Sequence, residues 1–289
     1  MSAVIYTNAA SLVAQKSLLG AQNSLAQSVE RLSSGIRINR AKDDAAGLGI
    51  AENLKKQLNA VKQGITNLND AISLSQTAEG ALQSVSAMTQ RMVTLSTQGA
   101  NDTLSNDQRS SIATELGALR TAINNIAART SYSGNSVFNA TAFDIQTSLL
   151  SADKVTISAT ALAKIDIASS SPANSKALAL NTAIEAVAGA TPTLTTASFQ
   201  TLQTAASDYL SEITLQRGRI GATQNQLEYT VSNLTEYANN LSSAVSRVMD
   251  TDYASETANL TKGQILQQAA TAMLAQANQM PNVILTLLK

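Results

Sequence analysis

The feature that most constrains this chain is an apolar stripe of nearly fifty residues in its second half. Its members are three or four residues apart, which is the period of a helix that packs along one face of a coiled coil. One helix cannot bury so long a stripe against itself, so it needs a partner helix or a partner molecule. The stripe runs through Leu202, Ala206, Leu210, Ile213, Arg217, Ile220, Gln224, Leu227, Val231, Leu234, Ala238, Leu241, Val245 and Val248.

The first half of the chain supplies a matching stripe over residues 50–98. At 1.5 Å per residue such a helix would be roughly 70 Å long. A further helix is expected from Ser105 to about Thr130, because Ser105 and Gln108 have the spacing of a capping box. The simplest arrangement pairs the two long stripes antiparallel. We therefore expect a mainly α fold, a long antiparallel α-helical coiled-coil rod formed by the N- and C-terminal halves.

The segment between these halves has a different pattern. Residues 143–146 and 155–158 alternate apolar with polar side chains, as short half-buried strands do, and residues 177–188 fit a short helix. We expect a small β-hairpin-containing variable tip, with residues 141–196 forming a short surface-exposed segment.

Composition removes most kinds of chemistry. The 289 residues include no histidine, no cysteine and no tryptophan, and the formal net charge is zero. Thiolate nucleophiles, Ser-His-Asp triads and imidazole metal sites are thereby excluded. A neutral chain without a long apolar run also argues against nucleic-acid binding and membrane insertion. We expect no catalytic residues, no metal and no cofactor, and a carboxylate-pair hydrolase built from Asp144, Asp153, Asp166 and Glu185 is disfavoured.

The two ends of the chain are thin, Ala-rich amphipathic segments with little to pack on within one molecule. Short isolated helices are marginal in water. We therefore expect these ends to become ordered against neighbouring copies, which is an argument for self-assembly from the residues alone.

Several motifs resemble bacterial flagellins. Residues 30–51, ERLSSGIRINRAKDDAAGLGIA, are similar to the N-terminal signature of that family. Near the other end, residues 246–254, SRVMDTDYA, and 264–279, QILQQAATAMLAQANQ, are similar to its C-terminal segment, as is RGRIGA at 217–222. Two long motifs in the right order at opposite ends make the resemblance specific over about residues 1–140 and 200–289.

The resemblance implies a structural subunit that self-assembles into the flagellar filament for swimming motility. It also implies export without a cleaved signal peptide to an extracellular filament, with a secretion chaperone, the filament cap and hook-junction proteins as partners. The terminal helices, residues 1–45 with 251–289, would form an inner tube, and the rod, residues 46–140 with 197–250, an outer one. The inner-tube contacts between subunits would be Leu18, Leu25, Val29, Leu32, Ile265, Leu266, Met273 and Leu274, and the rod-packing residues Leu58, Ile65, Ile72, Leu227, Leu234 and Leu241.

Host immune receptors are further partners that the resemblance suggests. The positions that match the vertebrate receptor's contacts are Arg91, Leu95 and Glu115. A plant receptor reads the 30–51 segment, where the matching residues are Arg37, Lys42, Asp43, Asp44 and Gly47. The plainer interpretation of Lys42, Asp43 and Asp44 is a solvated hinge that caps the next helix.

The alternative function is a hook–filament junction or related axial protein, which shares helical termini with flagellins. The C-terminal match favours a filament subunit over this alternative. A junction protein should not form long filaments alone.

Overall fold

The computed structural model describes residues 8–167 and 175–287, the last eight by their backbone only. The outermost parts of the predicted terminal segments, residues 1–7 and 288–289, and residues 168–174 of the middle segment lie outside this description. The chain forms two compact units, one of residues 1–58 with 239–289 and one of residues 59–238. The mainly α class is confirmed, with six helices and short antiparallel strand pairs.

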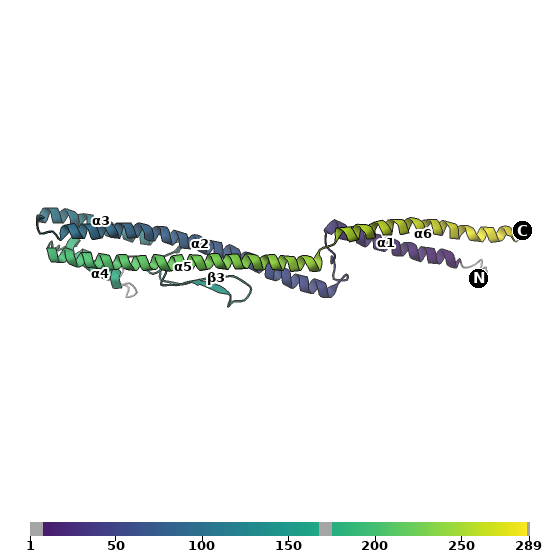
Figure 1. Ribbon diagram of the computed structural model, residues 1–289, viewed down its shortest axis with the longest axis horizontal. Coiled ribbons are helices and arrows are strands. Elements are labelled where there is room, and N and C mark those ends of the chain that lie inside the picture. Colours follow the sequence, from purple (N-terminus) through teal and green to yellow (C-terminus); the bar gives the residue numbers. More distant parts are fainter. Residues whose placement is uncertain (1–7, 168–174, 288–289) are drawn as a thin grey trace. The chain divides into compact units, whose positions relative to one another are not determined.

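The first unit is built on an antiparallel pair of helices, α1 (Ala9–Ser34) and α6 (Tyr253–Leu287), shown in Figure 1. Asn8 caps α1 by accepting a hydrogen bond from the Ser11 amide at 3.1 Å. Gly35 ends α1 in the left-handed region, with φ of 72°, and its amide donates to the Arg31 carbonyl.

Small side chains line the seam between α1 and α6, so the two backbones lie close together. A Cβ atom placed on Gly263 would lie 3.6 Å from the Cβ of Leu25, which is ordinary contact. Larger seam members stand between the small ones and are half-buried. The buried small residues are Ser11, Ala14, Ala21, Ser28, Gly263, Ala270 and Ala277, and the half-buried larger ones Leu18, Leu25, Leu32, Leu260, Gln267 and Leu274.

A short irregular link follows α1 and is tied to the end of α5 (Thr196–Met249) within the same unit. Ile36 forms an antiparallel β-bridge with Asp250, and the Arg37 amide donates to the Met249 carbonyl at 2.6 Å. Ile38 is 1% exposed and anchors the link. The link ends at Ala45, the first residue of α2 (Ala45–Gly99).

The second unit contains α2 from residue 59, α3 (Asn106–Arg129), and α5 as far as residue 238. Side chains of α2 and α5 meet in antiparallel order: Gln203 donates to Thr97 at 3.0 Å, and Gln224 to Glu79 at 3.3 Å. The predicted capping box is confirmed, because Ser105 and Gln108 each bond the other's backbone amide.

The predicted rod-packing residues divide into buried and half-buried ones. Leu227 is fully buried in the second unit, and Leu58 and Leu241 are buried in the first. Ile65, Ile72 and Leu234 are half-buried at the edges of the core. The core follows the two predicted stripes, since Leu202, Ala206, Ile213, Ile220 and Leu227 on α5 are buried, as are Val61, Leu68, Leu82, Val85 and Met92 on α2. Tyr209 and Gln216, each one position before a member of the predicted stripe, are buried as well.

Two small hairpins and a helix lie between α3 and α5. Strands β1 (Ser131–Tyr132) and β2 (Asn135–Ser136) are joined by Ser133 and Gly134, both with positive φ, as a type I′ turn requires. Strands β3 (Phe143–Gln146) and β4 (Lys154–Ile157) pair antiparallel, Phe143 opposite Ile157. These strands and α4 (Ser175–Ala188) confirm the predicted elements.

The middle segment combines exposed residues with a buried apolar side. Its apolar residues lie in the core of the second unit, because α3 and α5 leave apolar surface that α4 and the stretch after β4 cover. The Tyr209 hydroxyl donates to the Ile165 carbonyl and ties this stretch to α5, and burial raises the pKa of Tyr209. The buried members are Val155, Ile157, Ala161, Leu162, Ile165, Ile167, Ala177, Leu180, Ala183, Ile184 and Val187.

Candidate functional site: the outward apolar face of α1 and α6

Large apolar side chains on α1 and α6 point away from the seam into solvent. Each is between 49% and 66% exposed, whereas the seam itself holds mainly small residues. Because these large side chains do not face the partner helix, their apolar surface stays exposed to water within one copy. We call these residues the outward apolar face: Leu12, Val13, Leu19, Val29, Ile265, Leu266 and Met273.

A groove of about 630 Å³ runs through this face where α1 and α6 lie side by side. Its walls are apolar apart from a few polar side chains. Val13, Leu266 and Met273 contribute the bulk, Ala10 forms part of the wall, and Ser17 and Gln276 are polar members of the lining. Such a surface suits another apolar helix better than a charged or polar ligand.

The residues predicted to form inner-tube contacts separate into two sets. Val29, Ile265, Leu266 and Met273 belong to the outward apolar face. Leu18, Leu25, Leu32 and Leu274 are half-buried in the seam within one copy. Sequence periodicity could not separate the sets, because both faces of these helices carry apolar residues. The face also contains Leu12, Val13 and Leu19, which the sequence analysis did not select.

Polar contacts tie the α1–α6 pair at both ends of the seam. At one end Asn8 donates to the Ala277 carbonyl at 2.7 Å, and Ser11 donates to Asn278 at 3.1 Å. At the other end Arg31 lies 3.6 Å from Glu256, whose side chain is 9% exposed. Arg31 in the last turn of α1 and Glu256 in the first turn of α6 also each complement the dipole of their own helix.

The residues assigned to the vertebrate receptor lie in the second unit. Arg91 on α2 pairs with Glu115 on α3 at 2.8 Å, and both side chains are about half-exposed. Leu95 is only 2% exposed and packs in the core. The side chain of Leu95 is therefore not on the surface of this fold, unlike those of Arg91 and Glu115.

The residues assigned to the plant receptor serve the link between α1 and α2. The Arg37 guanidinium donates to the Val248 carbonyl at 2.7 Å. Asp44 accepts the Gly47 amide at 2.8 Å, in agreement with the predicted capping role, and Gly47 is buried where a Cβ would meet Asp44. Asp43 accepts hydrogen bonds from the amides of Arg40 and Asn39, which lower its pKa, while Lys42 is exposed.

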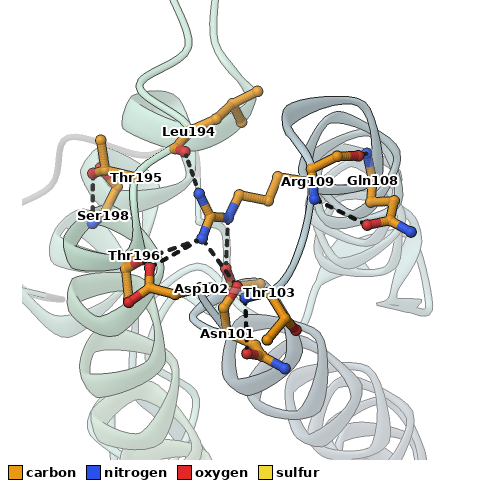
Figure 2. Close-up of polar contacts among 11 residues, drawn as sticks. Asn101, Asp102, Thr103, Gln108, Arg109, Leu194, Thr195, Thr196 and Ser198 are labelled. Atoms are coloured by element: carbon orange, nitrogen blue, oxygen red, sulfur yellow. Dashed lines mark hydrogen bonds and ion pairs between the residues drawn. The ribbon is translucent and has the colours of Figure 1, made fainter.

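A buried arginine in the second unit was not predicted from the sequence. Arg109 is 9% exposed, and its guanidinium donates to the carbonyls of Gly99 at 3.2 Å, Asn101 at 3.0 Å and Leu194 at 3.3 Å. Figure 2 shows this cluster, in which Arg109 also bonds Thr196 and Asp102. Arg109 thereby joins the end of α2, the start of α3 and the loop before α5. The sequence analysis assigned Arg109 no role, because most arginines are exposed on the protein surface.

A second polar residue was missed for the same reason. Gln216 is fully buried in the core, and neither its amide nitrogen nor its carbonyl oxygen has a hydrogen-bond partner. Buried polar atoms are paired in most proteins, so an amide of this kind lowers the stability of its surroundings.

Within residues 8–167 and 175–287, the structure brings together no three acidic side chains that could hold a metal ion. Among the helices described, none is long and apolar enough to cross a membrane.

Comparison with known proteins accounts for both ends of the chain. The profile of the bacterial flagellin N-terminal helical region matches residues 5–142, and that of the C-terminal helical region matches residues 200–288. A flagellin of Bacillus subtilis is 36% identical, with 94% of this chain and 95% of that one aligned. Polar flagellin F of Vibrio parahaemolyticus is 32% identical over the full length of both chains.

A solved structure described as a hook-associated flagellar protein of Vibrio parahaemolyticus is similar in fold, with a TM-score of 0.60, 72% of this chain aligned with all of that one, and 16% identity. At this identity the likeness concerns the fold alone. The two helical-region profiles and the full-length relatives decide the family: the chain belongs to the bacterial flagellins.

Proposed function

We propose that this chain is the repeating subunit of a flagellar filament, and that copies meet through the outward apolar face of α1 and α6. The observation that carries the second part is the direction of the large side chains. Leu266 and Met273 stand in solvent, while the seam between their helices holds Gly263, Ala270 and Ala277.

Burial of the outward apolar face supplies the driving force for assembly. Each Å² of apolar surface removed from water is worth about 25 cal/mol, and association costs are subtracted from that sum. Monomeric proteins rarely leave a large apolar patch uncovered, and Val13, Leu266 and Met273 line one apolar groove of this face. The role of the half-buried leucines of the seam is indirect in this proposal, because they pack α1 against α6 within one copy. They are Leu18, Leu25, Leu32 and Leu274.

The finer parts of the functional proposal come from family membership. They are export without a cleaved signal peptide, an extracellular location, and contacts with a secretion chaperone, the filament cap and hook-junction proteins. The flagellins are a structural family, and we assign this chain no catalytic activity.

The proposal for immune receptors is narrower than the sequence analysis suggested. Arg91 and Glu115 remain as surface residues for the vertebrate receptor, without Leu95. Residues 30–51 would be read by the plant receptor as a released segment, because Arg37, Asp44 and Gly47 are engaged in the folded link.

Seeded polymerisation followed by electron microscopy tests the assembly proposal. Short filament fragments are mixed with wild-type chain, with Leu266→Asp and with Leu178→Asp. Leu266 and Leu178 are both exposed leucines on helices, at 49% and 39%, but Leu178 lies outside the outward apolar face. We expect long filaments from wild type and Leu178→Asp, and none from Leu266→Asp, whose circular dichroism should stay helical.

Other results would count against this assignment. Normal filaments from Leu266→Asp would remove the outward apolar face as the meeting surface. A wild-type chain that binds fragment ends without extending them would favour the hook–filament junction alternative.

A further inference from the structure

Met273 differs from the other methionines whose side chains the structure describes. It is 64% exposed on α6, whereas Met92 and Met249 are buried and Met88 is half-buried. Its thioether lies in the groove of the outward apolar face, beside Val13 and Leu266. A soluble oxidant therefore reaches the sulfur of Met273 in a free copy more easily than the sulfurs of those three residues.

We propose that Met273 is an oxidation site that controls whether a free copy can assemble. The oxidant is hydrogen peroxide or another peroxide. The sulfur attacks the hydroxyl oxygen of the peroxide, the O–O bond breaks and a sulfur–oxygen bond forms. The leaving oxygen takes up the proton of the transferred hydroxyl, so it departs as water from hydrogen peroxide and as an alcohol from an organic hydroperoxide. Sulfur is oxidised by two electrons and the peroxide is reduced by two. The product is methionine sulfoxide, which sulfoxide reductases convert back.

The sulfoxide opposes assembly because of where it lies. Oxidation changes a flexible apolar side chain into a polar one with a strong hydrogen-bond acceptor. In a free copy water satisfies that acceptor at no cost. In a contact between copies, the surrounding Val13, Leu266 and Ala270 offer it no donor, and Ser17 and Gln276 are the polar side chains that line the same groove. Burial there replaces the water that surrounds the sulfoxide with a mainly apolar lining, which costs free energy. The backbone of α6 is untouched, so the folded copy itself is unchanged.

This inference rests on the proposed function, because the groove must be covered by a second copy. The absence of cysteine simplifies the test, since thiol oxidation cannot contribute. Wild-type chain, Met273→Leu and Met92→Leu are treated with dilute peroxide as free copies, freed of peroxide and seeded. Peptide mass spectrometry follows oxygen uptake at each methionine, and sedimentation gives the critical concentration for growth.

We expect Met273 to be oxidised ahead of Met88, Met92 and Met249. Oxidation should raise the critical concentration of wild type and Met92→Leu by roughly tenfold or more, and sulfoxide reductase should restore it. Met273→Leu, which keeps side-chain volume and apolar character, should assemble equally well before and after treatment. Met273→Gln mimics the sulfoxide without an oxidant and should raise the critical concentration by itself.

Three results would overturn the inference. The first is normal assembly of treated wild type in which Met273 is oxidised. The second is loss of assembly in treated Met273→Leu to the same extent as in wild type. The third is normal assembly of Met273→Gln. A failure of untreated wild type to assemble is a separate outcome, which removes the proposed function and this inference with it.

Discussion

The two long helix pairings of this molecule use a similar repeat in opposite ways. Between α2 and α5, large side chains such as Leu82, Met92 and Tyr209 fill the interior of the second unit. Between α1 and α6, the buried seam residues are alanine, serine and glycine, and the leucines between them are only half-buried. Other large side chains of these helices, such as Leu266 and Met273, are exposed. The α2–α5 pairing forms a core within one copy. The α1–α6 pairing leaves large apolar side chains exposed, and we propose that these are buried between copies. The two helix pairs therefore differ in the direction of their large apolar side chains and not in the period of the repeat.

The prediction with the largest expected effect compares leucine-to-alanine substitutions in the two helix pairings. Leu82→Ala removes a fully buried side chain and should cost about 2–5 kcal/mol of unfolding free energy. Leu266→Ala removes an exposed one and should leave the unfolding free energy of the free chain within about 0.5 kcal/mol. Urea denaturation followed by circular dichroism measures both. Equal costs would mean that the two pairings bury their leucines alike.

Arg109 tests what holds the far end of α2 and α5 together. Arg109→Met leaves the carbonyls of Gly99, Asn101 and Leu194 without their donor, and should cost about 2–3 kcal/mol. Arg129→Met removes an exposed arginine from the end of α3 and serves as the matched control. Thermal unfolding of the two variants gives the comparison. Equal melting temperatures would show that the hydrogen bonds of Arg109 add no stability.

Gln216 should show that the core of the second unit is not packed for greatest stability. Gln216→Leu replaces an unpaired buried amide by an apolar group of similar size, and should raise the unfolding free energy by about 1–2 kcal/mol. Gln226→Leu, at an exposed site on the same helix, should change it little. Chemical denaturation separates these outcomes. A loss of stability in Gln216→Leu would imply that the amide is satisfied in solution.

The smallest expected effect concerns the link of the first unit at acid pH. The amides of Arg40 and Asn39 hold the pKa of Asp43 below its usual 3.8. A lowered pKa in the folded state means that the stabilisation is present above the ordinary value and is lost as pH falls through the lowered one. Amide exchange at Arg40, compared between pH 5 and pH 2, should fall in protection in wild type. Asp43→Asn should show a smaller change, and an equal change would assign the transition to another group.

Much of the fold follows from local patterns. The capping box at Ser105 and the alternation in β3 and β4 depend on neighbouring residues, so the sequence alone predicts them. The burial of α4 and of Ile165 depends on surface left open by distant helices, so it was not foreseen. Arg109 and Gln216 were missed because hydropathy patterns treat every polar residue as external.

The sequence analysis selected only some of the residues of the outward apolar face. Val29, Ile265, Leu266 and Met273 were selected as interface residues, because large apolar side chains on thin terminal helices need a partner. Leu12, Val13 and Leu19 were not selected, and Leu18 and Leu25 were grouped with the outward residues. The sequence could not separate these sets, because adjacent rows on one helix differ by a single position and only the placement of α6 shows which row faces it.

The seven-residue repeat of the seam has a consequence for its register. Leu18, Leu25 and Leu32 are seven residues apart, and so are Gly263, Ala270 and Ala277 on the other helix, where Gly263 lies beside Leu25. A repeat of this kind brings the same types of side chain together again after a shift of one heptad, roughly 10 Å, so the repeat alone does not fix the register. The end contacts, Asn8 with Ala277 and Arg31 with Glu256, mark the observed position. These end contacts therefore set the register of α1 against α6, which the repeat by itself defines only to within a whole heptad.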